Sequence, residues 1–116
     1  MLQFKQTKEN DILILEIIGE IDASSSIELD LTIAKIVDLG ATKILIDCSS
    51  LEYISSAGLG VFMSYIEEFK EKKLIMILFG MKKKVFHTFE ILGLSKILNI
   101  CETNEEAKKT LNELSI

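Results

Sequence analysis

The chain has 116 residues, of which 48% are hydrophobic and 27% are charged, and its formal net charge at neutral pH is −5. This length and this apolar content predict one globular domain over residues 1–116 with a single core, which excludes a two-domain protein and a disordered chain. An acidic surface repels phosphate backbones and anionic bilayers, so neither a nucleic acid nor a membrane is an expected partner.

The N-terminal residues show the pattern of a β-hairpin. Apolar and polar side chains alternate in residues 2–5, residues 10–11 have the Asn-Asp sequence of a turn, and residues 12–18 are an apolar run rich in isoleucine. Because a short turn joins the two strands, the pair is predicted to be antiparallel.

A helix, a buried strand and a loop are predicted next. Apolar residues recur at helical spacing over residues 27–37, and Ser25 precedes Glu28 at the spacing of a capping box. Residues 44–46 are apolar between Lys43 and Asp47, which predicts a short buried strand over residues 43–47, and a loop is expected to lead from it to Ser55.

The rest of the chain continues the alternation of helix and strand. A second helix has its apolar face over residues 59–69 and ends in the charged residues 67–73, and apolar residues at 85–92 and 107–114 predict two more helices. Strands are predicted over residues 74–79 and 97–100, and Thr103 and Glu106 have the spacing of a second capping box. The element order β-β-α-β-α-β-α-β-α predicts an α/β fold with a mixed, mainly parallel sheet and an antiparallel N-terminal edge strand. Functional sites of such sheets lie beyond the carboxyl ends of the strands. In this chain the segments at that position are residues 19–26, after the second strand, and residues 47–60, after the third.

The sequence lacks the residue patterns that catalysis and metal binding require. His87 is the only histidine and has no cysteine or carboxylate cluster beside it, so neither a catalytic triad nor a metal site is expected. Gly58-Leu59-Gly60 is followed by no Lys-Ser/Thr and by no third glycine at dinucleotide spacing. Residues 82–84 are lysines, interpreted as a solvated helix face or as a contact for an acidic partner. We therefore expect a binding protein without a cofactor rather than an enzyme.

The cysteines and the N-terminus indicate the cellular location. Cys48 and Cys101 are far apart and form no C-x-x-C motif, which is typical of a reducing compartment. Residues 1–9 carry charges where a signal peptide has an apolar core, and no apolar run approaches the roughly 20 residues that span a bilayer. A cytoplasmic protein is expected, and the lack of a heptad seam predicts a monomer.

The segment from Tyr53 to Gly60 is the most informative part of the sequence. Ser55 and Ser56 stand at a helix start, where a serine can serve simply as the N-cap. Gly58 and Gly60 fall in the first helical turn, where each glycine costs about 1 kcal/mol relative to alanine. Two such glycines indicate that another molecule approaches the backbone closely at this edge of the sheet.

With these motifs, the chain resembles the STAS domain family, and within it the bacterial anti-sigma factor antagonists. The resemblance covers nearly the whole chain and rests on motifs that occur in the same order, at residues 19–22, 46–47, 51–60, 85–89, 93–97 and 105–107. In that family a serine of the loop is phosphorylated by an anti-sigma factor that is itself a serine kinase. The unphosphorylated antagonist binds this kinase and frees the sigma factor, and a serine phosphatase restores the unphosphorylated form.

The resemblance implies a STAS-type sheet and a set of functional residues. Aligned on the two glycines, it implies that Ser56 is phosphorylated, although the best-known members have Asp-Ser where this chain has Ser55-Ser56. The implied partner-binding residues are Asp22, Ser24, Asp47, Ser55, Ser56, Gly58 and Gly60.

The residues themselves also allow other roles. From the residues alone, turn and N-cap chemistry is the favoured interpretation of Asp22 and Ser24, with the partner-binding rim as the alternative. Asp47 is as well suited to organising the loop as to contacting a partner. An alternative function within the family is a STAS module that never switches and serves as an accessory subunit of a transporter or a lipid-trafficking complex. Ser56 favours the switching antagonist, because a permanent scaffold has no need of a hydroxyl there.

Overall fold

The computed structural model describes residues 2–115, and it begins with the expected hairpin. Strand β1 (Leu2–Glu9) pairs antiparallel with β2 (Ile12–Ile21) along its whole length, from Leu2 opposite Gly19 to Glu9 opposite Ile12. Asn10, in the turn, adopts φ 55°, a backbone conformation that asparagine tolerates better than most residues. The predicted antiparallel pair is confirmed.

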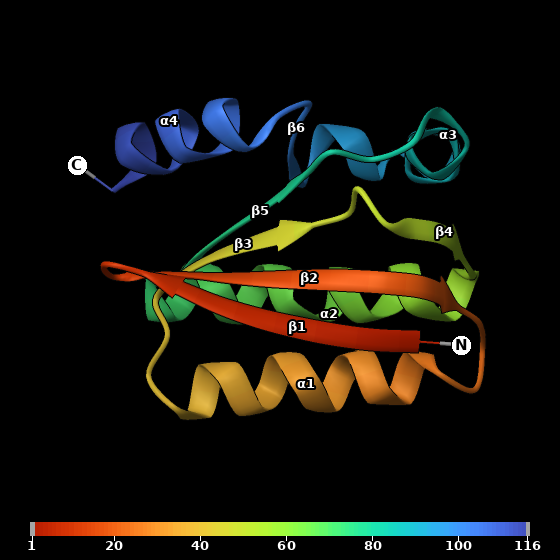
Figure 1. Cartoon of the computed structure of the whole chain (residues 1–116), viewed down its shortest axis with the longest axis horizontal. Helices are drawn as coiled ribbons and strands as arrows, with labels where there is room; N and C mark the ends of the chain where they lie inside the picture. Colours follow the sequence, from red (N-terminus) through yellow and green to blue (C-terminus); the bar gives the residue numbers. More distant parts are fainter. Residues whose placement is uncertain (1, 116) are drawn as a thin grey trace.

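Parallel strands form the rest of the sheet, and helices connect most of them (Figure 1). The remaining elements are α1 (Ser26–Asp38), β3 (Lys43–Asp47), β4 (Leu51–Ile54), α2 (Ser56–Lys72), β5 (Ile75–Phe79), α3 (Lys83–Ile91), a 3-10 turn η1 (Leu94–Lys96), β6 (Asn99–Cys101) and α4 (Asn104–Leu114). The strand order is β1-β2-β3-β5-β6, with β1 at one edge and every pairing beyond the hairpin parallel. The predicted fold class is confirmed.

The core lies on both faces of the sheet. Because successive strand residues point to opposite faces, Leu15 and Ile17 of β2 pack toward Phe62 of α2, whereas Ile14 packs toward Leu111 of α4. Figure 1 accordingly shows α4 across the sheet from α1 and α2. Side chains of α1, α2 and α3 share the larger core cluster. Because the strands that precede these helices run parallel, the loops that enter them lie at the same end of the sheet.

The segment expected to be a loop before Ser55 contains a strand. Strand β4 pairs parallel with the last residues of β2, with Glu20 opposite Tyr53 and Ile21 opposite Ile54, next to a bulge at Gly19/Glu20. Strand β2 therefore pairs with β3 along its first part and with β4 along its end. Four residues with only two buried side chains are too short for a clear periodic signal, which explains why the sequence pattern missed this strand.

Two local predictions also need correction. The capping box of Ser25 and Glu28 does not form, because the Ser25 side chain turns back to Asp22. The last strand begins at Asn99, and the 3-10 turn η1 lies immediately before the predicted start at Ile97. At α4 the expected N-cap is confirmed, since Thr103 Oγ1 accepts a hydrogen bond from the Glu106 N–H at 3.1 Å.

Candidate functional site

The carboxyl ends of β2 and β4 bring two loops together at one end of the sheet (Figure 1). Ile21 lies opposite Ile54 in the last paired position, and the Ser55 N–H donates to the Ile21 carbonyl at 2.8 Å. The turn into α1 and the start of α2 are therefore neighbours. We call residues 22–25 and 55–60 together the α1–α2 rim.

Helix α2 begins with two serines in different environments. Ser55 is the N-cap: its backbone is extended, at φ −84° and ψ 170°, and its Oγ accepts a hydrogen bond from the Gly58 N–H at 3.2 Å. Ser55 is half-buried, whereas Ser56, the first helical residue, is exposed. The first turn carries no acidic side chain, so the positive end of the helix dipole is not neutralised there.

The two glycines of the rim have unlike surroundings. Gly58 is buried, and a Cβ at this position would lie 2.7 Å from Ile54 Cγ1 and 2.8 Å from Ile21 Cγ2. Gly58 therefore has a packing role, because the absence of a side chain lets α2 approach the ends of β2 and β4. Gly60 is exposed, and a Cβ there would have nothing within 4 Å. Of these two glycines, only Gly60 exposes its backbone at the surface of the rim.

Asp22 organises the turn into α1. Its Oδ1 accepts hydrogen bonds from the Ser25 N–H at 2.8 Å, the Ser24 hydroxyl at 2.8 Å and the Ser25 hydroxyl at 2.9 Å. The Asp22 N–H in turn donates to Ser25 Oγ at 2.9 Å, so the reciprocal capping box lies one turn earlier than predicted. These donors, the Ser25 N–H first and then the Ser24 hydroxyl, lower the pKa of Asp22 to about 2.

Asp47 organises a different turn. Its Oδ1 accepts from the Ser49 N–H at 2.9 Å and from the Ser49 hydroxyl at 2.7 Å, which shapes the connection between β3 and β4. The four residues of β4, roughly 13 Å of extended chain, separate this turn from Ser55. Asp47 is therefore placed to organise the loop, and it lies apart from the α1–α2 rim along the chain.

The lysines at the start of α3 have a partner within the chain. Glu52 of β4 lies 3.4 Å from Lys82 Nζ and 3.3 Å from Lys84 Nζ, and the hydrogen bonds from Lys84 and then Lys82 lower the pKa of its carboxyl group. These contacts link α3 to the strand that precedes Ser55. The sequence shows that Glu52 and the lysines have opposite charges, but they are about 30 positions apart, so only the folded structure reveals that they pair.

Large apolar side chains are exposed near the rim and were missed by the sequence pattern. Ile27 at the start of α1, Tyr53 of β4 and Met63 of α2 are 64%, 51% and 48% exposed. Ser56, Gly60 and Met63 follow one another at the spacing of a single helix face, which makes a stripe of small and apolar residues.

The part of the chain described, residues 2–115, contains no cluster of three or more His, Cys, Asp or Glu side chains that could hold a metal ion. His87 is exposed on α3, with Nδ1 3.6 Å from the Glu90 carboxylate. Within the same range, no helix has the length and apolar character needed to cross a membrane.

Known proteins share this sequence pattern and this fold. Residues 3–107 match the sequence model of the STAS domain. The anti-sigma-B factor antagonist of Listeria monocytogenes is 29% identical over 93 residues, which cover 80% of this chain and 82% of that protein. An anti-sigma factor antagonist from Mycobacterium paratuberculosis superposes with a TM-score of 0.88 at 19% identity, over 97% of this chain and 95% of that one. The Bacillus cell fate determinant SpoIIAA, in its phosphorylated form, superposes with a TM-score of 0.68 at 20% identity, over 96% and 99% of the two chains.

Proposed function

The chain belongs to the STAS domain family, and from that premise we propose that it is an anti-sigma factor antagonist controlled by phosphorylation of Ser56. In this proposal the unphosphorylated protein binds an anti-sigma factor serine kinase and frees the sigma factor. Phosphorylation by the kinase releases the antagonist, and a serine phosphatase restores the binding form. The protein acts by binding, as a cytoplasmic monomer when alone, and not as an enzyme.

The observation that carries the proposal is the difference between the two serines of α2. The Ser55 hydroxyl is half-buried and engaged with the Gly58 N–H, whereas Ser56 is exposed at the first helical position. A kinase needs access to the hydroxyl it modifies, so Ser56 is the better acceptor. The Listeria relative, named an anti-sigma-B factor antagonist, supports the role, and SpoIIAA, solved in a phosphorylated form, supports control by phosphate.

A phosphate on Ser56 suits a switch that leaves the fold intact. It adds about −1.5 to −2 charges at neutral pH. The N-terminal end of a helix accepts such a charge through its free N–H groups and its dipole, and the first turn of α2 has no acidic side chain to repel it. A partner surface packed over Ser56 would instead have to bury a dianion, which is strongly unfavourable.

The proposed partner surface is the stripe that begins at Ser56, flanked by the turn into α1. Exposed Gly60 allows close approach of the partner backbone, and Met63 and Ile27 supply apolar contact area. Asp22 and Ser24, held by their mutual hydrogen bond, form a polar margin of this surface. Gly58 and Asp47 contribute indirectly, through the packing of α2 and the shape of the β3–β4 turn.

Mapping of the phosphorylated residue tests this proposal. The chain is incubated with its partner kinase and ATP, and the phosphate is located by peptide mass spectrometry in the parent and in the Ser56→Ala, Ser55→Ala and Ser64→Ala variants. Ser64 is an exposed serine of the same helix and serves as the control. Phosphate is expected on Ser56 in every variant that retains it. Phosphate on neither Ser55 nor Ser56 would favour the non-switching accessory subunit.

A further inference from the structure

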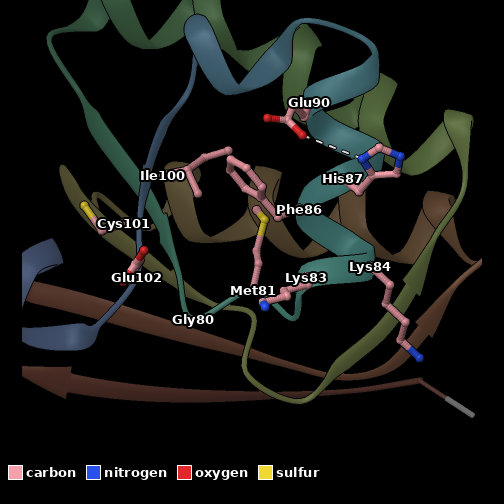
Figure 2. A pocket seen from close by; sticks show the side chains of 10 residues that line it. All are labelled: Gly80, Met81, Lys83, Lys84, Phe86, His87, Glu90, Ile100, Cys101 and Glu102. Carbon is pink, nitrogen blue, oxygen red and sulfur yellow. Dashed lines mark ion pairs between the residues drawn. The ribbon is translucent and has the colours of Figure 1, made fainter.

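A cleft of about 910 Å³ opens between α3 and the end of β6, at the carboxyl edge of the sheet (Figure 2). Met81 after β5, Phe86 of α3 and Ile100 of β6 line it with apolar surface, and each of these side chains is only partly buried. Its volume falls within the range of sites for small molecules, roughly 300–1,000 Å³. The cleft shares no lining residue with the α1–α2 rim.

One lysine of the cleft is available for a ligand. Lys83 and Lys84 both line the cleft, and Lys84 is held by Glu52 at 3.3 Å. Lys82 is also paired with Glu52. Lys83 is exposed and makes no ion pair with residues 2–115. An anion in the cleft can therefore pair with the Lys83 ammonium group without breaking an existing ion pair, whereas pairing with Lys84 would compete with Glu52.

The carboxylates of the cleft limit the charge of a ligand. Glu90 lies seven residues after Lys83 on α3, about 10 Å along the helix axis, and Glu102 follows the end of β6. These two carboxylates repel a second negative group on the ligand. The His87 Nδ1 atom lies 3.6 Å from the Glu90 carboxylate. A ligand that pairs with Lys83 and avoids repulsion by Glu90 and Glu102 has one negative group and an apolar body.

We propose that this cleft binds a small amphipathic monocarboxylate. Its carboxylate pairs with the Lys83 ammonium group, and its aromatic or aliphatic body packs against Met81, Phe86 and Ile100. The binding is non-covalent and independent of phosphorylation at Ser56, so it is a second activity of the same domain.

The test is an NMR titration of the ¹⁵N-labelled full chain with 3-phenylpropionate and, separately, with octanoate. Amide shifts should concentrate at Met81, Phe86, Ile100 and Cys101, with the rim unaffected. The uncharged analogue 3-phenylpropan-1-ol should bind about tenfold more weakly than 3-phenylpropionate, because it forms no charge-assisted contact. The dianion phenylsuccinate should also bind more weakly than the monocarboxylate.

Matched lysine variants separate a specific contact from general attraction. Lys83→Met should lower the affinity for 3-phenylpropionate to that of the alcohol, and thermal melts check that this variant is folded. Lys96→Met removes the same charge from an exposed lysine outside the cleft and should leave the affinity unchanged. Equal losses in both variants, equal binding of acid and alcohol, or no cleft shifts with either acid at millimolar concentration would each overturn the proposal.

Discussion

The Ser55 N–H donates a 2.8 Å hydrogen bond to the carbonyl oxygen of Ile21, which joins the start of α2 to the last residue of β2. Asp22, the next residue after that carbonyl, caps the turn into α1. The serine pair and the Asp22 network are therefore held to the same strand end. A substitution that displaces the serine pair is therefore expected to shift the Asp22 network as well, and the reverse.

Substitutions of Ser56 should separate the effect of charge from that of the hydroxyl. Ser56→Ala keeps a small neutral surface, so it should bind the partner kinase as tightly as the parent and resist release by ATP. Ser56→Glu places an unpaired charge in the interface and should lower the affinity at least about 100-fold. Affinities are measured by titration calorimetry without ATP. Equal binding of both variants would contradict control at Ser56.

Ser55→Ala should affect folding and leave phosphorylation in place. It removes the acceptor of the Gly58 N–H, and loss of an N-cap costs about 1 kcal/mol. Urea unfolding measures this loss, with Ser56→Ala as the control that keeps the cap and stays within about 0.5 kcal/mol of the parent. A larger stability loss in Ser56→Ala than in Ser55→Ala would reverse the assignment of the two serines.

Gly58→Ala and Gly60→Ala should have opposite effects on stability. At Gly58 the new methyl group meets Ile54 and Ile21 below 3.0 Å, and overpacking of this kind costs about 1–3 kcal/mol. At Gly60 there is open space, so alanine should raise the free energy of unfolding by up to about 1 kcal/mol. Gly60→Ala should still weaken kinase binding. Equal stability of the two variants would show that α2 does not require the close approach at Gly58.

Stability should depend on the charge of Asp22 at low pH. Its folded-state pKa, about 2, lies below the ordinary value of 3.8, so its stabilising effect is fully present above about pH 4 and is lost as the pH falls through about 2. The urea midpoint of the parent should exceed that of Asp22→Asn at neutral pH, and the difference should shrink between pH 4 and pH 2. A difference that stays constant over this range would mean that the carboxylate charge makes no contribution.

Met63→Ser should weaken partner binding without a comparable effect on folding. Met63 is 48% exposed on the stripe that begins at Ser56, and surface substitutions change stability by about 0.5 kcal/mol or less. Leu39→Ser is the control, because Leu39 is 77% exposed at the other end of α1. Calorimetry should show reduced affinity for the first variant alone. Equal losses in both would mean that the contact is not local to the stripe.

The sequence alone predicted the elements whose signal is local and strong. Residues 12–18 are apolar except for Glu16, and residues 44–46 are apolar between Lys43 and Asp47. The alternation of strands with helices then determines a mainly parallel sheet with its loops at one end. The serine-glycine segment also indicated the start of α2, because capping residues and glycines act within one helical turn. These features depend on neighbours within a few positions along the chain.

Only the tertiary structure decided the features that depend on distant residues. Strand β4 exists because Tyr53 and Ile54 pair with the end of β2, and Gly58 is buried because Ile21, 37 positions away, packs against it. Both Ser25-x-x-Glu28 and Asp22-x-x-Ser25 have cap spacing, and the fold selected the second, in which the Asp22 carboxylate gathers three donors. A periodic pattern contains no information on which residues meet after the chain closes, because that choice is made by the packing of all the elements together.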